Sequence, residues 1–234
     1  MFAKTAEFYD LVYSFKDYEA EAAKIRDLIH AKHPSAKAIL DVACGTGEHA
    51  RFLAANFSID GIDLQPEFVE AAQRKVSGGE FTTGDMRNFE LKKKYDVVQC
   101  LFSSIGYLTS GEDVISALRS FRSHLKPGGI VVVEPWFTPD VYQAGGLHMA
   151  PPIDQPDLKI VRMNVSEIDG NLSRLRFNYL VGRKEGIELI KEDHCLALYS
   201  VAEMLSFFDQ ANLKAEYDPE GIFGRGLYVA RDAI

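Results

Sequence analysis

The sequence has little positive charge for its length. Its 234 residues include 26 lysines and arginines against 34 aspartates and glutamates, which gives a formal net charge of −8. Nucleic acids and anionic membranes both favour a basic surface, so this balance argues against either as the main partner. A small anionic ligand is still compatible, because it requires only a local basic pocket.

Long hydrophobic runs and paired cysteines are also missing. No apolar run reaches the roughly 18 residues of a membrane span, and the first residues, MFAKTAEFYD, do not resemble a signal peptide. Cys44, Cys100 and Cys195 are scattered thiols of odd number with no CxxC pair. This pattern predicts a cytoplasmic protein without disulfides. The histidines lack the spacing of metal ligands, so we expect no metal site.

Short apolar runs alternate with amphipathic stretches between residues 37 and 136. The runs at 38–43, 58–63, 95–102 and 129–135 are typical of buried parallel strands. The stretches at 47–57, 66–76 and 111–125 have apolar residues at helical spacing. This alternation predicts an α/β fold with a Rossmann-like, doubly wound, mostly parallel sheet.

The pattern changes after Pro135. Residues 136–157 are rich in proline and glycine and are expected to form a loop, whereas 158–200 suggest three antiparallel strands. A helix over 200–213 and two strands within 214–232 complete the chain. We expect a single domain made of a helical N-terminal cap (1–36), a cofactor-binding core (37–136), a three-stranded antiparallel insert covering the active site (137–199), and a C-terminal helix with the final strands (200–234).

The clearest chemical motif is the glycine-rich turn Asp41-Val42-Ala43-Cys44-Gly45-Thr46-Gly47, which follows an apolar strand and opens a helix. Glycine allows a tight turn and a close approach of the backbone to a ligand. Carboxylates follow the next two strands, at Asp63 in GIDL and at Asp85 in GDMR. A carboxylate at the position of Asp63 can accept hydrogen bonds from ribose hydroxyls. Together these residues predict a nucleoside-containing ligand.

Gly45, Gly47 and Ala50 also fit the G-x-G-x-x-A fingerprint of dinucleotide sites. Charge separates the two interpretations. A dinucleotide would place a diphosphate beside Asp41, which would repel it, whereas a carboxylate attracts the ammonium and sulfonium of S-adenosylmethionine. The turn therefore favours S-adenosylmethionine, and a nicotinamide-dependent oxidoreductase stays as a remote alternative.

DVACGTG, GIDL, GDMR and HLKPGG have the order and spacing of the motifs of class I S-adenosylmethionine-dependent methyltransferases, which the first 134 residues resemble. The resemblance implies that S-adenosyl-L-methionine is the cofactor. It implies that Asp41 and the loop through Gly47 hold the methionyl part, that Asp63 binds ribose, and that Asp85 lies beside adenine. The cofactor-binding residues expected on this basis are Tyr18, Asp41, Ala43, Gly45, Gly47, Asp63, Leu64, Asp85, Met86 and Phe102.

A second resemblance covers nearly the whole chain. AEFYDLVY, KDY, FSSIGYL, VVVEPW and GRGLYV are similar to bacterial nucleotide-sugar N,N-dimethyltransferases of the desosamine and mycaminose type. This resemblance implies a dTDP-linked 3-amino sugar as the acceptor, and a homodimer. It also implies that Tyr9 and Tyr107 lie near the acceptor amine as catalytic residues. The residues implied to bind the substrate are Trp136, Tyr179 and Arg225, with Arg225 at the diphosphate.

The chain departs from the pattern of that family at three places. The glycine-rich stretch before KDY is missing, Phe137 stands where a second tryptophan is usual, and Ile222-Phe223 replaces Pro-Ser before GRGL. The last change is expected to put a large apolar side chain beside Arg225, which argues against a diphosphate there. This change weakens the expectation of a dTDP carrier more than it weakens the expectation of N-methylation.

The expected reaction is an in-line displacement at a sulfonium, for which the protein supplies position and surroundings. We expect Tyr107, with Tyr9, to hydrogen-bond and aim a neutral amine rather than to take its proton. His49 and His194 are expected to be structural or surface residues. An O- or N-methyltransferase of another small metabolite and a cofactor-binding module without catalysis stay as alternatives. The acidic charge argues against a nucleic acid as the substrate. Enzymes that methylate amino groups of nucleic acids use an acidic residue followed by two prolines and an aromatic residue, whereas Glu134-Pro135-Trp136 has one proline.

Overall fold

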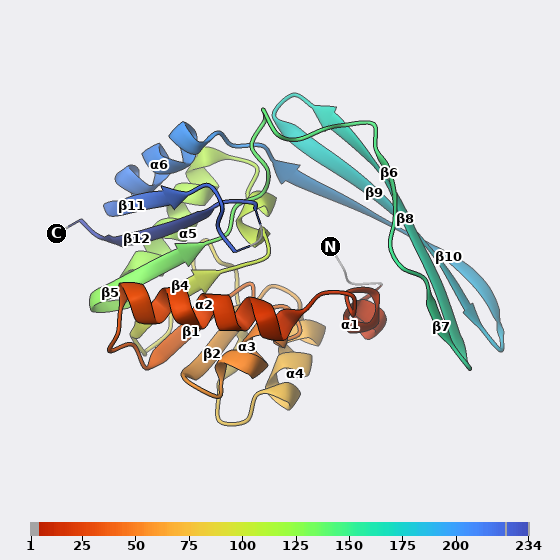
Figure 1. Ribbon diagram of the computed structural model, residues 1–234, viewed down its shortest axis with the longest axis horizontal. Coiled ribbons are helices and arrows are strands. Elements are labelled where there is room, and N and C mark those ends of the chain that lie inside the picture. The colour runs from red at the N-terminus through yellow and green to blue at the C-terminus, as the bar shows by residue number, and fades with distance from the viewer. Residues whose placement is uncertain (1–4, 223, 234) are drawn as a thin grey trace.

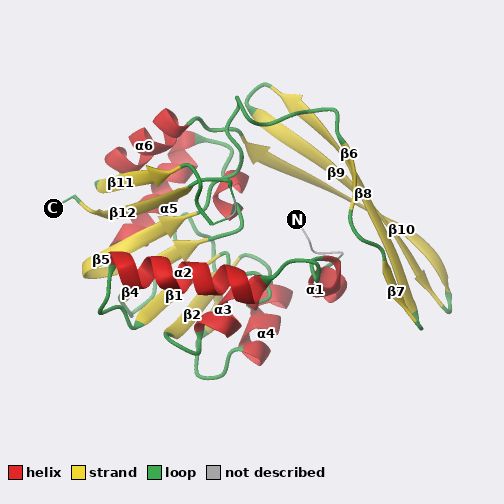
Figure 2. Ribbon diagram, viewed as in Figure 1, coloured by secondary structure: helices red, strands yellow, loops and turns green. Residues whose placement is uncertain are grey.

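The computed structural model describes residues 5–222 and 224–233. A seven-stranded sheet lies at its centre, in the order β11-β12-β5-β4-β1-β2-β3 (Figure 1, Figure 2). Its strands are β1 (Ala38–Val42), β2 (Ser58–Asp63), β3 (Phe81–Thr83), β4 (Tyr95–Cys100), β5 (Leu125–Val133), β11 (Leu213–Asp218) and β12 (Leu227–Asp232). Strands β1 to β5 pair in parallel, whereas β12 pairs antiparallel with β5 and β11. The predicted α/β fold with a mostly parallel sheet is confirmed.

Helices cover both faces of this sheet. Helices α2 (Tyr18–Lys32), α3 (Glu48–Leu53) and α4 (Pro66–Lys75) pack on one face, and α5 (Gly111–Ser123) and α6 (Val201–Gln210) on the other (Figure 1). The hydroxyls of Ser110 and Ser200 cap α5 and α6, and Pro66 begins α4. Helix α3 is shorter than the predicted 47–57, because residues 54–56 form a turn that leads into β2. None of the helices in the described part of the chain is long and apolar enough to cross a membrane.

The second sheet is antiparallel and projects from the core as a long twisted arm (Figure 1). It consists of β6 (Leu147–Met149), β7 (Ile153–Gln155), β8 (Leu158–Asp169), β9 (Leu172–Arg183) and β10 (Gly186–Ala197). The three long strands match the prediction, but β6 and β7 lie in the stretch expected to be a loop. Each of these two is only three residues long and is defined by its pairing with β8, so no alternating pattern marks it in the sequence.

The two faces of the arm differ in what they contact. One face packs against the N-terminal segment, where η1 (Ala6–Phe8) and α1 (Tyr9–Val12) precede α2. The cluster between them contains Phe8, Val12, Tyr13, Ile160, Phe177, Tyr179, Val181 and Ile190. The opposite face exposes apolar side chains, among them Met163, Leu180 and Leu189. The N-terminal segment and the arm are therefore held together beside the carboxyl ends of the parallel strands of the central sheet.

Candidate active site

The conformation of the glycine-rich turn after β1 is fixed by a hydrogen bond and by two glycines with positive φ values. The backbone N–H of Gly45 donates to Asp63 Oδ2 at 2.9 Å, which ties the turn to the end of β2. Gly45 and Gly47 have φ values of +55° and +79°, in the left-handed region that favours glycine. A Cβ on Gly45 would meet nothing within 4 Å, whereas one on Gly47 would lie 2.9 Å from Ala72 Cβ. Gly45 therefore leaves space for a ligand, and Gly47 allows α4 to pack closely.

Two buried carboxylates stand at the ends of β1 and β2. Burial raises the pKa of Asp41 to about 6, and the side-chain amide of Gln99 donates to Asp41 Oδ1 at 3.1 Å. Burial also raises the pKa of Asp63, although the backbone N–H groups of Gln65 and Gly45 oppose the shift. Since burial disfavours the negative form of both groups, a nearby cation would be bound favourably here.

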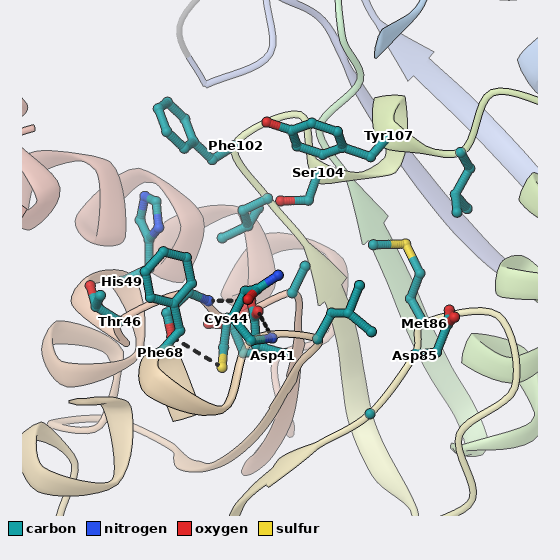
Figure 3. Close-up of a pocket in the computed structure, with 18 of the residues that line it drawn as sticks. Asp41, Cys44, Thr46, His49, Phe68, Asp85, Met86, Phe102, Ser104 and Tyr107 are labelled. Carbon is teal, nitrogen blue, oxygen red and sulfur yellow. Dashed lines mark hydrogen bonds between the residues drawn. The ribbon is translucent and has the colours of Figure 1, made fainter. Parts of the chain in front are cut away.

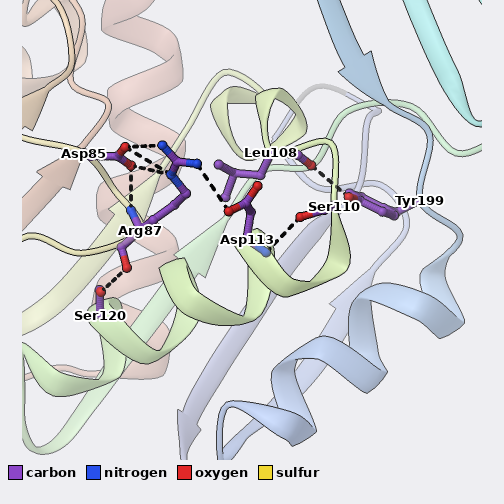
Figure 4. A network of polar contacts seen from close by, with 7 residues as sticks. All are labelled: Asp85, Arg87, Leu108, Ser110, Asp113, Ser120 and Tyr199. Carbon is purple, nitrogen blue, oxygen red and sulfur yellow. Dashed lines mark hydrogen bonds and ion pairs between the residues drawn. The ribbon is translucent and has the colours of Figure 1, made fainter.

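The rim of the site is formed by the segment after β3. Asp85 pairs with Arg87 at 2.6 Å, and Arg87 also contacts Asp113 at 3.3 Å (Figure 4). The hydrogen bond from Arg87 holds the pKa of Asp85 below its ordinary value. The apolar side chain of Met86 lines the same cavity (Figure 3), as does that of Leu64, which is 56% exposed. This rim offers apolar surfaces and a fixed carboxylate to a flat heterocycle.

These groups line a cavity of about 310 Å³ at the carboxyl ends of the parallel strands (Figure 3). The structure brings together nearly all of the residues expected to bind the cofactor: Tyr18, Asp41, Ala43, Gly45, Asp63, Leu64, Asp85, Met86 and Phe102. Gly47 is not in the lining, because it packs against α4. His49, expected to be structural or at the surface, also lines the cavity and lies 2.7 Å from Glu21. No group of three or more metal-ligating side chains occurs within residues 5–222 and 224–233.

A second cavity of about 290 Å³ adjoins the first, between the core and the arm. Four residues line both cavities: Tyr9, Phe102, Ser104 and Tyr107. Trp136 and Arg225 line only the second, while Tyr179 lines neither and is buried in the core of the arm. Burial raises the pKa of both Tyr9 and Tyr107, so these phenols stay protonated at neutral pH.

Arg162, on β8, lines the second cavity and was not singled out in the sequence. Its guanidinium lies 4.8 Å from the ring centroid of Tyr13 and 5.3 Å from that of Phe177. Its Nε and Nη1 atoms are buried and have no hydrogen-bond partner within the described residues. Side chains alternate between the two faces of β8, and Arg162 shares a face with the buried Ile160. This alternation was the signal in the sequence that could have placed Arg162 on the packed face of the strand.

Two further cations line the same cavity. Nη1 of Arg225 donates to Ser103 Oγ at 3.3 Å, and its guanidinium lies 5.7 Å from the ring centroid of Trp136. The ammonium of Lys16 lies 4.2 Å from the ring centroid of Phe102. The second cavity thus combines positive charge with aromatic walls, whereas the first contains the buried carboxylates.

The side chain of Ile222 turns into the core of the molecule. It is 6% exposed and packs with Leu227, and the backbone carbonyl of Ile222 accepts a hydrogen bond from Lys24 Nζ at 3.0 Å. The left-handed backbone at Gly221, with φ +54°, accompanies this inward turn. The large apolar side chain expected beside Arg225 is that of Phe223, which stands in place of serine and lies outside the described residues.

A chain of buried polar groups leads from Tyr107 into the arm. Tyr107 Oη lies 2.8 Å from Nδ1 of His194. Nε2 of His194 lies 3.7 Å from Glu192 Oε2, and Thr5 Oγ1 donates to the two carboxylate oxygens of Glu192 at 3.1 and 3.0 Å. His194 was expected to be structural or at the surface; it is 2% exposed and contacts a residue that lines both cavities.

The parallel sheet, the glycine-rich turn and the acidic ends of β1 and β2 together form the site of a class I S-adenosylmethionine-dependent methyltransferase. The residues present fit that cofactor. The space over Gly45 admits it, Asp41 favours its positive charges, Asp63 offers acceptors to its ribose hydroxyls, and Leu64 and Met86 provide apolar surfaces for its base.

Comparison with known proteins agrees with this class and narrows it. Residues 39–129 match the methyltransferase domain family. The chain is 37% identical over 228 residues to the dTDP-3-amino-3,4,6-trideoxy-alpha-D-glucopyranose N,N-dimethyltransferase of Streptomyces venezuelae, covering 96% of each protein. It is 37% identical to the dTDP-3-amino-3,6-dideoxy-alpha-D-glucopyranose N,N-dimethyltransferase of Streptomyces fradiae, covering 96% of this chain and 89% of that protein.

Solved structures show the same likeness. The crystal structure of DesVI from Streptomyces venezuelae matches with a TM-score of 0.89 and 36% identity, covering 96% of this chain and 97% of the other. The SAM-bound structure of CalS10, an amino pentose methyltransferase from Micromonospora echinaspora, matches with a TM-score of 0.86 and 31% identity, covering 96% of both chains. The chain belongs to the S-adenosylmethionine-dependent sugar N,N-dimethyltransferase family.

Proposed function

We propose that the protein transfers methyl groups from S-adenosylmethionine to the amino group of a dTDP-linked amino sugar. The observation that carries this proposal is the meeting of two cavities at Tyr9 and Tyr107, one with buried carboxylates and the other with arginines. The relatives from Streptomyces venezuelae and Streptomyces fradiae are named for dTDP-3-amino sugars, and their similarity extends over nearly the whole chain.

The first cavity holds the cofactor. Asp63 would accept hydrogen bonds from the ribose hydroxyls, and Asp41 would bind the methionyl ammonium. Leu64, Met86 and Asp85 would hold the adenine. When bound, S-adenosylmethionine supplies a methyl group carried on a sulfonium. The aromatic residues Tyr18 and Phe102 line this cavity with largely apolar surface, which suits the loss of positive charge at sulfur.

The second cavity holds the nucleotide sugar. Arg162 and Arg225 bind the diphosphate through charge-assisted hydrogen bonds, and Trp136 forms a wall of the sugar pocket. The buried Nε and Nη1 of Arg162 support this assignment, because buried donors are normally satisfied by an acceptor. Tyr179 acts indirectly, by packing in the cluster of the arm that holds Tyr13 in place.

Catalysis is by alignment. Tyr107, with Tyr9, accepts a hydrogen bond from an N–H of the amine. This bond orients the amine so that the nitrogen lone pair points at the methyl carbon. Such alignment of two reactants contributes about 7–11 kcal/mol to catalysis. Because burial raises the pKa of both phenols, neither is expected to act as a phenolate base.

The chain is expected to act as a single domain. In this proposal the N-terminal cap (1–36) and the arm (137–199) close the site over the core (37–136), and the C-terminal part (200–234) completes the sheet; residues 1–4, 223 and 234 of these ranges lie outside the described residues. We also expect a cytoplasmic homodimer with no nucleic-acid or membrane partner. The net charge of −8 supports the absence of those partners, and the apolar outer face of the arm supports self-association.

Mass spectrometry of a reaction with S-adenosylmethionine and a dTDP-linked 3-amino-dideoxy sugar tests the proposal. We expect products with one and then two added methyl groups, and no product from the matched 3-hydroxy sugar nucleotide. An untouched amino sugar, with cofactor binding retained, would contradict the acceptor. Methylation of the hydroxy analogue would favour an O-methyltransferase instead.

A further inference from the structure

The direction of the Tyr107 hydroxyl depends on its partner in the arm. A phenol has one proton to donate and two lone pairs that accept. Tyr107 Oη lies 2.8 Å from His194 Nδ1, and Tyr107 also lines both cavities. If Nδ1 is bare, Tyr107 donates to it and presents lone pairs to the cavity. If Nδ1 carries the proton, Tyr107 accepts from it and presents its own O–H to the cavity.

Glu192 decides between these two states. Its Oε2 lies 3.7 Å from His194 Nε2, on the far side of the imidazole from Tyr107. An ionised carboxylate only accepts hydrogen bonds, so its proximity favours the imidazole proton on Nε2 and leaves Nδ1 bare. The Thr5 hydroxyl donates to both oxygens of Glu192, at 3.1 and 3.0 Å, and thereby fixes the carboxylate.

The surroundings hold this chain in one geometry. Glu192 and His194 occupy alternate positions of β10 and are 8% and 2% exposed, whereas Asp193 between them is exposed on the opposite face. The ring of Phe177 stands edge-on to the His194 ring, with centroids 5.0 Å apart and an interplanar angle of 88°. The imidazole is thus enclosed, so its rotation is restricted.

We propose that Glu192 and His194 are positioning residues that keep the Tyr107 hydroxyl as a hydrogen-bond acceptor toward the substrate amine. This inference rests on the proposed function. Tyr107 then requires an N–H on the nucleophile: a primary amine has two and a secondary amine has one. Each transfer breaks the bond between sulfur and the methyl carbon, leaves S-adenosylhomocysteine and gives an ammonium, which releases one proton to solvent. The tertiary amine left after the second transfer and proton loss has no N–H, so its bond to Tyr107 is lost and methylation stops there.

Glu192→Gln tests the chain with little change of shape. The Gln side-chain oxygen still accepts from Thr5, while its amide N–H faces Nε2 of His194 and drives the imidazole proton to Nδ1. Tyr107 is then reversed, and its O–H competes for the amine lone pair. We expect kcat to fall by about tenfold or more, with KM for the sugar and the Kd of the cofactor changed less than about twofold. Asp193→Asn, on the exposed face of the same strand, is the matched control and should leave kcat unchanged.

The double variant Glu192→Gln/Tyr107→Phe separates positioning from a structural role. Without a hydroxyl to reverse, the double variant should be no slower than Glu192→Gln alone and should match Tyr107→Phe. If Glu192 only stabilises the arm, the two losses add, and a double variant slower than either single variant overturns the proposal.

Nitrogen-15 NMR of the histidine rings gives a readout independent of turnover. In the enzyme bound to S-adenosylhomocysteine, we expect His194 to be protonated at Nε2, and at Nδ1 in Glu192→Gln. The same tautomer in both proteins overturns the inference. Failure of the wild-type protein to methylate the amino sugar would instead contradict the proposed function, and the tautomer result would still decide the role of Glu192.

Discussion

A guanidinium buried among aromatic rings is stabilised by an anion, which offsets the cost of burying the charge and accepts its hydrogen bonds. Arg162 meets this description, since its Nε and Nη1 atoms are buried without a partner within the described residues. We expect Arg162→Met to raise KM for the dTDP-sugar by about 10- to 150-fold, because a hydrogen bond to a charged group contributes about 1.5–3 kcal/mol. Steady-state kinetics measure this change, and the Kd of S-adenosylmethionine should stay the same.

Arg176→Met provides the control for that substitution. Arg176 lies on the exposed outer face of β9 and pairs with Glu167 at 2.9 Å. Its loss removes the same charge without touching the cavity. Equal increases of KM in the two variants would show that net charge, and not the site, governs the affinity for the sugar nucleotide.

Asp41 is expected to make cofactor binding depend on pH. Burial raises its pKa to about 6, so a falling pH neutralises it before the ordinary value of an aspartate, about 3.9, is reached. We expect the affinity for S-adenosylmethionine to weaken as the pH falls from 7.5 to 5, and binding near pH 6 to release a proton. Calorimetry in buffers of different ionisation enthalpy measures both. Asp41→Asn should bind weakly without this pH dependence.

The same pKa predicts an effect on the stability of the cofactor-free protein. Because the folded-state pKa lies above the unfolded value, the buried charge destabilises the fold above pH 6, and this cost disappears as the pH falls toward 4. Asp41→Asn should therefore unfold at a higher temperature than the wild type at pH 8, and the difference should vanish near pH 4. A difference that is constant with pH would contradict the assignment.

At the scale of elements, the turn between β1 and α3 uses its two glycines for different purposes. Gly47→Ala adds a Cβ 2.9 Å from Ala72 Cβ at a φ of +79°, and we expect it to lower the free energy of unfolding by about 2–5 kcal/mol. Gly45→Ala pays only the backbone strain of about 1–2 kcal/mol, because its Cβ would enter open space.

That open space is where we expect the cofactor, so Gly45→Ala should weaken its binding more than it lowers stability. Thermal unfolding and the Kd of S-adenosylmethionine, measured on both variants, separate the two effects. The ratio of the loss of cofactor affinity to the loss of unfolding free energy should be larger for Gly45→Ala than for Gly47→Ala. Equal ratios would contradict the distinction between a packing glycine and a ligand-contacting glycine.

At the scale of the whole molecule, the outer face of the arm carries an apolar patch that the chain itself leaves uncovered. Neighbouring strands bring its members together, as in the pairs Leu180–Leu189 and Met149–Met163. The exposed side chains are Leu147, Met149, Met163, Val165, Leu180, Ile187 and Leu189. Exposed apolar patches commonly mark protein interfaces, and here they support the expected homodimer.

If the expected dimer forms through this face, Leu180→Glu/Leu189→Glu should convert it to a monomer, because two buried charges without partners oppose association. Size-exclusion chromatography with light scattering measures the change. The affinity for S-adenosylmethionine should stay the same, since this face is opposite the one that packs on the N-terminal segment. Lys214→Glu, on β11, is the control. A wild-type protein that is monomeric at micromolar concentration would contradict the assembly.

The sequence by itself determined the α/β core and most of the residues that line the first cavity. Alternating apolar runs and helical stretches, and a glycine turn followed by Asp63 and Asp85, are local patterns whose period and order are visible along the chain. Parallel strands bring their carboxyl ends to one edge, so residues far apart in sequence, such as Asp41 and Met86, could be assigned to one cavity in advance.

Only the tertiary structure decided which side chains meet across the arm. The pairing of β8 with two three-residue strands leaves no periodic pattern in the sequence. Arg162 is recognised as a candidate site residue only from the aromatic rings that surround it. His194 and Tyr107 are 87 residues apart, and Ile222 turns inward at a reversal of the chain. Such contacts arise from the packing of distant segments, whose geometry depends on shape and burial rather than on any local period.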